Sequence, residues 1–401
     1  MVKKILCHCF SLAALCSKQT YKNPQFLSKS TFPLTAPVNN LPLYTQIHRR
    51  NQKPTIITDF QQHICRNLVL LPSKLSIKSI SKRVTMVTLV VSTTIDPASI
   101  GPASALLAMT GWSSGPSFEG VRSYSNREVR LLQHDKSIVV EDNLDTRWEE
   151  LTQENVDNVI FLSKHTAATN RPALTIHPIG VPHLKEGDIL PHGGRAGWVA
   201  PPNPRMGPWI RLLSEISQSH NLIPEFEITM EATHHGPVTS KPTMFLEIGS
   251  TLEYWKREDA AQVIALLVWE GLGLGGGAAV GQWDRNCEKN KVLLGLGGGH
   301  YVPHHMKIIR KDNVWVGHLL SGYSLPMDDP GQSKVEDAKG IGGTWKEAIR
   351  VAFEATKIAF PGGEILAHLD HKSFKGWQKK AMTNYLEEMN IKIAKPNEFL
   401  E

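Results

Sequence analysis

Cysteine is nearly absent from most of this 401-residue sequence. Of its 5 cysteines, only Cys287 lies beyond residue 85. A disulfide framework is therefore excluded for residues 86–401, and a reducing compartment is expected. The CxxC and HExxH patterns are missing as well. Spacing alone therefore identifies no metal site.

Long apolar runs and phosphate-loop motifs are also missing. No segment reaches the ~18–20 apolar residues that a membrane-spanning helix needs, which argues against a membrane protein. The stretch KVLLGLGGGHYVPHH (291–305) follows an apolar segment but lacks the GK[ST] ending of a phosphate-binding loop. EGLGLGGGAAVG (270–281) contains GxGxxG but follows a helical pattern. It indicates a glycine-rich helix end rather than a dinucleotide site.

Acidic residues are nearly absent from the first 85 residues, where Asp59 stands against 13 lysines and arginines. The remaining residues carry 31 basic and 37 acidic side chains, so the net charge of +6 combines +12 with −6. All 10 tryptophans lie in the second part, as expected for a globular core. We therefore predict a disordered, basic, Ser/Thr-rich leader (1–85) and a single catalytic domain (86–401).

Three interpretations of the leader stay open. Its Lys, Ser and Thr content is typical of an organelle transit peptide, which would place the protein in the chloroplast or mitochondrion. Its first residues, MVKKILCHCFSLAALC, faintly resemble a secretory signal. It could also be an extension of a protein that starts at Met86, which would then be cytoplasmic, with the nucleus also open.

Short apolar or β-branched segments alternate with helical patterns along residues 86–401. MVTLVVSTT, VIFLSKHTA, ALTIHPIG, EFEITMEATHHGP, TMFLEIGS, KVLLGLGGG, NVWVGHLLSGYS and EILAHLDHKSF are expected strands. Helices are expected over 207–221, 250–273, 344–360 and 375–390, the second with Ser250 as N-cap and Glu253 closing a capping box. This order predicts an α/β fold with a mixed or mainly parallel sheet flanked by helices.

Four histidines fall at or just beyond the ends of expected strands: His165, His234, His235 and His300. Ligands of open α/β sheets bind outside the carboxyl ends of the strands, so we expect these imidazoles to meet at one sheet edge. They could act as bases or hold zinc, and Glu231 could orient one of them. His177 and His183 flank Gly-Pro or Pro turns and are expected to be structural.

The glycines beside His300 suggest a close-approach pocket. Gly298 and Gly299 could present backbone amides to an oxyanion, with His300 as their working partner. His304 and His305 are expected at the rim. Pro303 makes a helix here unlikely unless it occupies the first turn.

A basic tail offers the best candidate for a nucleic-acid contact. Lys372, Lys375 and Lys379 lie around Phe374 and Trp377, a mixture that suits a phosphate backbone and a stacked base. A solvated helix start would show the same residues.

Taken together, the motifs resemble one family. MVTLVVSTTIDPAS, VIFLSKHTA, RPALTIHPIG, EFEITMEATHHGP, KPTMFLEIGS, LLGLGGGHYVPHH and GHLLSGYSLP, in this order, are similar to the archaeal and plant type of D-aminoacyl-tRNA deacylase. The resemblance covers residues 86 to about 399, and the tail GGEILAHLDHKSFKGWQKKA resembles the plant members.

The resemblance implies a hydrolase that cleaves the ester between a D-amino acid and the terminal adenosine of tRNA, with zinc as a cofactor. It also implies chiral proofreading, protection against aldehydes, and a fold like that of peptidyl-tRNA hydrolases or nucleoside phosphorylases. Its motifs match His165, His234, His235, Gly236, Gly298, Gly299, His300 and His318.

From these positions we predict three sets of site residues. The catalytic set is His300, His235 and His165. The substrate-binding set is Gly236, Gly298, Gly299, His318, Lys372, Lys375 and Lys379. The metal set is His165, His234 and His300. A zinc-dependent amidohydrolase or a nucleoside phosphorylase-like enzyme is the alternative, and a non-catalytic RNA-associated protein is a third possibility.

Overall fold

The computed structural model describes residues 85–286, 290–331 and 340–400. The predicted leader, apart from its last residue, and Cys287 lie outside these ranges. The described residues belong to one compact unit, Ser79–Glu401. None of their helices is long and apolar enough to cross a membrane.

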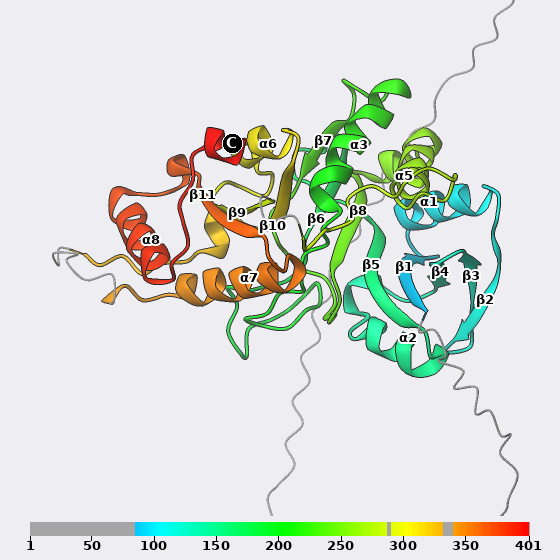
Figure 1. Cartoon of the computed structure of the whole chain (residues 1–401), viewed down its shortest axis with the longest axis horizontal. Coiled ribbons are helices and arrows are strands. Elements are labelled where there is room, and N and C mark those ends of the chain that lie inside the picture. The colour runs from blue at the N-terminus through cyan, green and yellow to red at the C-terminus, as the bar shows by residue number, and fades with distance from the viewer. Residues whose placement is uncertain (1–84, 287–289, 332–339, 401) are drawn as a thin grey trace, which may run out of the picture. The chain divides into compact units, whose positions relative to one another are not determined.

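The described strands form two sheets (Figure 1). The larger sheet has the order β2-β3-β4-β1-β5-β8-β6-β7 and the smaller the order β10-β9-β11. In chain order the strands are β1 (Met86–Thr93), β2 (Ser113–Phe118), β3 (Val121–Asn126), β4 (Val129–His134), β5 (Asn155–Lys164), β6 (Ala173–His177), β7 (Glu227–Met230), β8 (Thr243–Gly249), β9 (Lys291–Leu296), β10 (Val314–Leu320) and β11 (Glu364–Leu369).

Strand directions make the larger sheet mixed and the smaller one parallel. β4, β1, β5 and β8 run parallel, β6 is antiparallel to β8, and β2 and β3 add an antiparallel meander. In the smaller sheet both pairs are parallel. The predicted α/β class with a mixed sheet flanked by helices is confirmed. The expectation of one shared sheet is wrong, because β9, β10 and β11 form a separate sheet that pairs with no strand of the larger one among the described residues.

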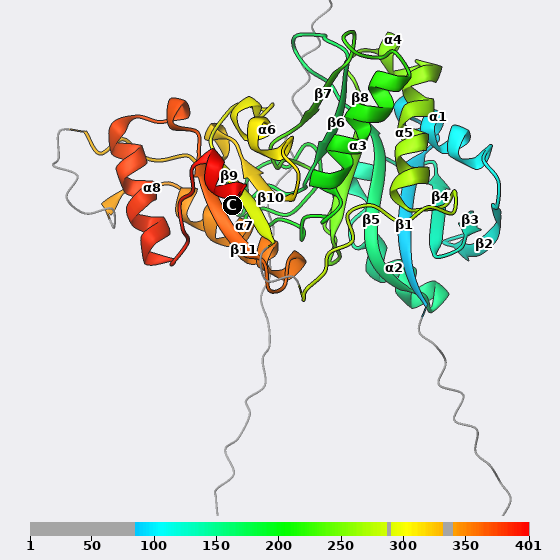
Figure 2. The same ribbon diagram turned by 45° about the horizontal axis from the view of Figure 1, so that its top comes forward.

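Helices cover both sheets (Figures 1 and 2). One apolar core of the larger sheet includes side chains from α1, α3 and α5, and another includes side chains from α2. Helices α6, α7 and α8 accompany the smaller sheet. In chain order the helices are α1 (Pro97–Leu107), α2 (Leu144–Thr152), α3 (Met206–Ser219), α4 (Leu252–Trp255), α5 (Glu258–Gly271), α6 (Pro303–Ile309), α7 (Trp345–Ala359) and α8 (Gly376–Glu388).

Strand β5 shows why the parallel strands are continuous apolar runs in the sequence. Ile160 and Leu162 belong to the core on one face, whereas Val159 and Phe161 belong to the core on the other. Because successive side chains point to opposite faces, a strand covered on both sides is apolar at every position. The burial of β5 fixes where its carboxyl end, and thus His165, must lie.

Two local predictions for 250–273 are wrong. The expected single helix breaks at Arg257, which is extended and stands before the acidic first turn of α5. Ser250 is not an N-cap, since its hydroxyl donates to the Arg171 carbonyl and Thr251 precedes α4. Acidic residues favour the start of a new helix at Glu258 because they complement its dipole. Pro303 does open a helix, at the first turn of α6.

Candidate active site

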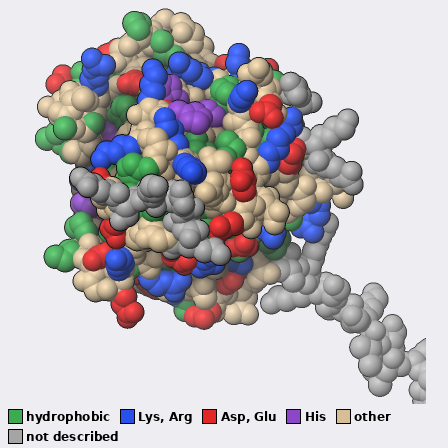
Figure 3. All heavy atoms as spheres, turned by 90° about the vertical axis from the view of Figure 1, so that its left-hand side faces the viewer, with side chains coloured by type: hydrophobic (Ala, Val, Ile, Leu, Met, Phe, Trp, Pro, Cys, Tyr) green, Lys and Arg blue, Asp and Glu red, His purple; other side chains and the backbone are tan. Residues whose placement is uncertain are grey.

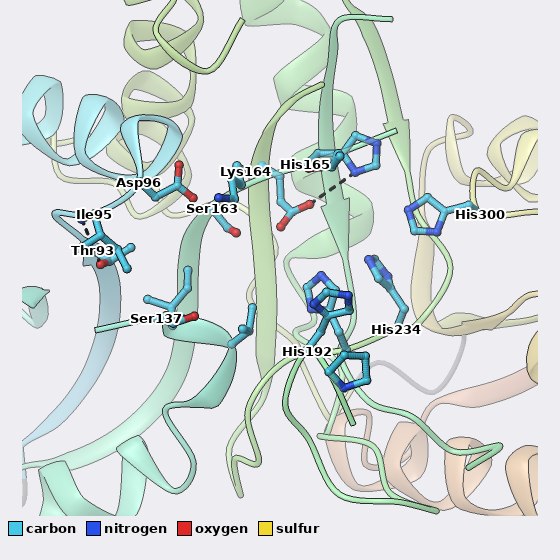
Figure 4. Close-up of a pocket in the computed structure, with 16 residues that line it drawn as sticks. Thr93, Ile95, Asp96, Ser137, Ser163, Lys164, His165, His192, His234 and His300 are labelled. Carbon is cyan, nitrogen blue, oxygen red and sulfur yellow. Dashed lines mark hydrogen bonds and ion pairs between the residues drawn. The ribbon is translucent and has the colours of Figure 1, made fainter. Parts of the chain in front are cut away.

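A cavity of about 620 Å³ lies at the carboxyl ends of β1, β4, β5 and β8 (Figure 4). This volume is within the ~300–1,000 Å³ range of small-molecule sites. The segments after these strands contribute polar side chains, and the loop before α3 contributes His192. The lining residues are Thr93, Ile95, Asp96, Ser137, Ile138, Val139, Ser163, Lys164, His165, Thr166, Pro191, His192, His234, His235, Glu247 and His300.

The four histidines expected at strand ends meet here. The ring centroid of His234 lies 4.2 Å from that of His235 and 4.5 Å from that of His300. His165 stacks on His300 at 5.5 Å. They do not share one sheet edge, however, because His300 follows β9 of the smaller sheet. The cavity therefore stands where the two sheets approach each other.

Backbone pairing joins the two sheets at this point. The Ala232 amide donates to the His300 carbonyl at 2.8 Å, and Glu231 forms an antiparallel bridge with Tyr301. The chain leaving β7 thus pairs with the chain leaving β9. This pairing brings Glu231 and His300 together although they are far apart in the sequence.

Glu231 is the common partner of three imidazoles. Its side chain is fully buried, with Oε1 lying 2.9 Å from His165 Nδ1 and Oε2 lying 2.8 Å from His300 Nε2. His234 Nε2 lies 3.4 Å from the same Oε2. Neither oxygen has a partner in good hydrogen-bond geometry among the described residues. Glu231 is therefore held by charge and can exchange these contacts for a ligand.

A second buried carboxylate, Glu247 of β8, lies near the first and lines the cavity. It lies 3.7 Å from both His165 Nδ1 and His177 Nε2. The His177 ring packs 4.1 Å from that of His234. Two carboxylates and several imidazoles in a buried space form a coupled ionic network.

Burial and neighbouring charges shift the pKa values of the histidines and carboxylates in this network in different directions. Burial opposes a charge on His165, but the adjacent Glu231 and Glu247 raise its pKa to about 10. Burial opposes ionisation of the two carboxylates too, yet the histidines hold the pKa of Glu231 well below its usual range and that of Glu247 at about 2. Burial, then the neighbouring His177, lowers the pKa of His235 to about 3. Burial opposes a charge on His177 as well, yet Glu247 raises its pKa. The centre thus pairs carboxylates with imidazoles of raised pKa and keeps the neutral imidazole of His235 nearby.

Tyr301 completes the environment of His165. Its hydroxyl lies 2.9 Å from His165 Nε2, on the side of the ring opposite Glu231. Burial raises the pKa of Tyr301, so the phenol stays neutral. With His165 protonated, the phenolic oxygen accepts the second ring proton. Both nitrogens of His165 are therefore engaged by the chain.

Comparison with known proteins identifies the family. The model of the D-aminoacyl-tRNA deacylase family matches residues 152–394. A D-aminoacyl-tRNA deacylase from Arabidopsis thaliana is 66% identical over 316 residues, which is 78% of this chain and 100% of the relative. The chain belongs to the D-aminoacyl-tRNA deacylase family. The predicted resemblance is thereby confirmed.

More distant relatives and one solved structure agree. A D-aminoacyl-tRNA deacylase from Pyrococcus furiosus is 30% identical over 241 residues, covering 59% of this chain and 81% of the relative. The crystal structure of a conserved protein of unknown function has a TM-score of 0.60 at 24% identity, covering 79% of this chain and 97% of that one. At this identity the likeness concerns the fold alone.

Within this deacylase-family chain, His318 is not at the cavity. It is fully buried in β10, with Nε2 donating to the Ala200 carbonyl at 2.9 Å and Nδ1 lying 3.0 Å from the Thr233 hydroxyl. Its expected role in substrate binding is corrected to a structural one. By holding Thr233, it fixes the segment that carries His234.

The glycines are corrected in the same way. The Gly298 amide donates to Ser373 Oγ at 2.7 Å, so it is not available to an oxyanion, and neither Gly298 nor Gly299 lines the cavity. Gly236 does not line it either, and its amide donates to the His192 carbonyl at 3.2 Å. Gly236 has a φ of +97°, and a Cβ there would lie 2.9 Å from Ile179. These glycines shape the walls of the site.

Two further expectations for the stretch 291–305 and the tail are wrong. His305 is fully buried rather than at the rim, with Nδ1 2.9 Å from His368 Nδ1. Phe374 is buried against Gly297 and cannot stack on a base. His304 is half-buried, and its Nδ1 lies 2.8 Å from Asp370 Oδ2.

The three lysines of the tail lie apart from the cavity lining. Lys372 and Lys375 are exposed, Lys379 is partly buried, and Lys375 Nζ lies 3.3 Å from Asp329 Oδ2. The bond from Gly298 to Ser373 joins this segment to the loop that carries His300. On the face drawn in Figure 3, lysine and arginine side chains surround a group of histidine side chains.

The donor set fits zinc, although the ligand grouping differs from the expected one. Within the described ranges, donor atoms of His165, Glu231 and His300 lie within 4.8 Å of one another, as do those of His177, His234 and His235. The predicted trio of His165, His234 and His300 is not such a group, since Glu231 takes the place of His234. Two imidazoles and a carboxylate are a frequent ligand set of catalytic zinc.

Sequence reasoning missed the role of two buried groups. His177 was expected to be structural, and Glu247 was not singled out. Glu247 is the sole charged residue in β8, a strand whose residues are all buried. A buried acid rarely persists without a partner, so this lone charge was the available signal.

Proposed function

We propose that this chain hydrolyses the ester bond of D-aminoacyl-tRNA and releases the free D-amino acid and tRNA. Relatives named D-aminoacyl-tRNA deacylase, one of them matched over its whole length, support this activity. The observation that carries it is the pair of Glu231 and His300 beside a cavity. A small-molecule amidohydrolase or phosphorylase-like activity is not favoured, because these relatives carry the deacylase name.

His300 is the residue best placed to accept a proton from water. Its side chain is 38% exposed, and its Nε2 faces Glu231 Oε2 at 2.8 Å. A proton on Nε2, which the adjacent carboxylate attracts, leaves Nδ1 as the proton acceptor. Nδ1 lies 3.3 Å from the Tyr323 hydroxyl, and a water molecule would take the place of that hydroxyl. This arrangement satisfies the geometric needs of a general base.

We further propose zinc as the cofactor. His165 would hold the ion with Glu231 and His300 after losing the proton that the two carboxylates stabilise. When bound, the ion would supply a water molecule of lowered pKa, and His300 would then be a ligand instead of the base. The buried oxygens of Glu231, which lack good hydrogen-bond geometry, support this assignment. Zinc content by atomic absorption, compared between the wild type and Glu231→Gln, tests it.

The remaining parts of the proposal concern substrate and place. We assign to the chain chiral proofreading at the acceptor end of tRNA, and the removal of D-aminoacyl adducts whose amino group carries a small alkyl. The name of the Arabidopsis thaliana relative supports action on D-aminoacyl-tRNA, and the second assignment rests on the resemblance of the motifs alone. If residues 1–85 form a transit peptide, the enzyme acts in the chloroplast or mitochondrion. If translation starts at Met86, it acts in the cytoplasm, with the nucleus also open.

The decisive experiment compares matched D- and L-aminoacyl-tRNA, with and without chelator. Turnover of the D ester alone is expected, and turnover of neither ester would overturn the proposal. His300→Ala should lose most activity. Wild-type activity in that variant would remove His300 from catalysis.

A further inference from the structure

The loop before α3 contributes a wall of the cavity that the chemistry above does not use. Pro191 and His192 both line the cavity. Both side chains are exposed, so they stand at its mouth. The His192 ring centroid lies 6.2 Å from that of His235, so the mouth residue still faces the histidine centre.

Two glycines fix this loop in place. Gly193 has a φ of +75°, and a Cβ on it would lie 1.6 Å from the Val139 carbonyl oxygen. Gly194 has a φ of +92°, and a Cβ there would lie 3.1 Å from the Gly236 carbonyl oxygen. Only residues without a Cβ allow so close an approach at positive φ. The loop is thus pressed between the segment after β4 and the segment after β7.

A hydrogen bond adds to this restraint. The His192 carbonyl accepts from the Gly236 amide at 3.2 Å, directly beside His235. The backbone that carries the His192 ring is therefore tied to the backbone that carries the histidine centre. Because this backbone is already ordered, a ligand that packs on the ring does not have to order the loop first.

Burial along the cavity gives it a direction. Glu247 is 1% exposed and His165 is 2% exposed, so these residues mark the deep end of the cavity, whereas the His300 side chain is 38% exposed. At the mouth, Ile95 is 62% exposed and Ser137 is also exposed. A tRNA end must enter from outside with its ester reaching the histidines. The terminal nucleoside, which is joined to the rest of the tRNA, then occupies the mouth.

The chemistry of the mouth suits a nucleobase. Unpaired bases stack on aromatic side chains, histidine included, and their flat faces also pack on apolar groups. His192 offers such a ring, and Pro191, Ile95 and Val139 offer apolar contacts around it. Figure 4 shows His192 and Ile95 among the residues that line the same cavity as His300.

We infer that His192 is a substrate-binding residue on which the terminal adenine of the tRNA stacks, an inference that rests on the proposed function. His192 touches the base and not the ester, so it contributes to binding of the substrate more than to the chemical step. Its effect is expected in KM, with kcat nearly unchanged. A phenylalanine at this position retains the stacking face and loses the ring nitrogens.

Steady-state deacylation of tRNA charged with D-alanine tests this. His192→Ala should raise KM roughly 5- to 100-fold, the range expected for one lost base stack. His192→Phe should return KM to within a few-fold of the wild type. His220→Ala, at an exposed histidine that ends α3 outside the cavity lining, is the matched control and should change nothing. An unchanged KM in His192→Ala, or a Phe variant as poor as the Ala variant, overturns the inference.

Binding of adenosine 5′-monophosphate by calorimetry separates this inference from the proposed function. Weaker binding to His192→Ala than to the wild type supports the stacking role even where the wild type shows no deacylation. Equal binding by both proteins overturns it whatever the turnover. If the wild type does not hydrolyse the D ester, in contrast, only the deacylase proposal is overturned.

Discussion

Replacing Glu231 by glutamine removes a negative charge from the centre of the site and keeps the shape of the side chain. The carboxylate lies 2.9 Å from His165 Nδ1 and 2.8 Å from His300 Nε2, and it is fully buried. Removal of one member of a buried ion pair costs ~3–5 kcal/mol of unfolding free energy. We expect about 3 kcal/mol, the lower end, because His165 keeps Glu247 at 3.7 Å.

The same substitution should slow the reaction. Glutamine cannot stabilise a proton on His300, so we expect the single-turnover rate of D-aminoacyl-tRNA deacylation to fall about 100-fold or more. This corresponds to about 2.7 kcal/mol in the activation barrier. Rates are measured with enzyme in excess, and unfolding free energies by urea titration. Glu227→Gln, at the exposed start of β7, the strand that ends just before Glu231, is the matched control and should leave both unchanged.

Each outcome for Glu231→Gln discriminates between roles. A deacylation rate within threefold of the wild type would refute the role of Glu231 in the site. Full activity with a large loss of stability would make it a purely structural carboxylate. A slow enzyme of wild-type stability would place its whole effect on catalysis.

Three other perturbations have definite expected results. Burial lowers the pKa of His318 to about 3, so the unfolded chain, at ~6.5, takes up more protons between these values. The contribution of His318 to the free energy of unfolding should therefore be level above pH 6.5 and fall toward pH 3, by about 1.4 kcal/mol at pH 5.5. His318→Gln should remove this part of the pH dependence in urea titrations. Charge reversal at Lys372 and Lys375 should weaken tRNA binding and its salt dependence; unchanged affinity at several salt concentrations would exclude them from the interface. Gly297 has a φ of +101°, and a Cβ there would lie 2.7 Å from the Phe374 ring. Gly297→Ala should therefore lower the free energy of unfolding by roughly 1–3 kcal/mol. An unchanged melting temperature would contradict this strain.

Much of the fold was predictable because its strands are buried on both faces. Runs such as VIFLS and TMFLE are apolar at nearly every position and end in polar or glycine residues. The meander β2–β4 was not predicted, because β2 at the sheet edge is largely exposed and carries serine, glycine and proline. Such a strand has no local signal stronger than that of a loop.

The division into two sheets was also out of reach. Periodicity identifies a strand but not its neighbour, and β9 has the same apolar pattern as the strands of the larger sheet. Only the parallel pairing of β9 with β10 and β11 separates them. The position of His300, across the cavity from His165, follows from that pairing.

The sequence by itself determined which residues could do chemistry and that they stand at strand ends. His165, His234, His235 and His300 do converge. They do not do so through one sheet edge, because β7 runs opposite to β5 and β9 belongs to the smaller sheet. Tertiary structure alone decided which of their neighbours matter. It buried Glu231 and Glu247, joined His318 and the Gly298 amide to neighbouring segments through hydrogen bonds, and brought His192 to the mouth of the cavity. The reason is physical: charge, burial and hydrogen-bond supply at a residue depend on groups distant in the chain, and no local pattern records them.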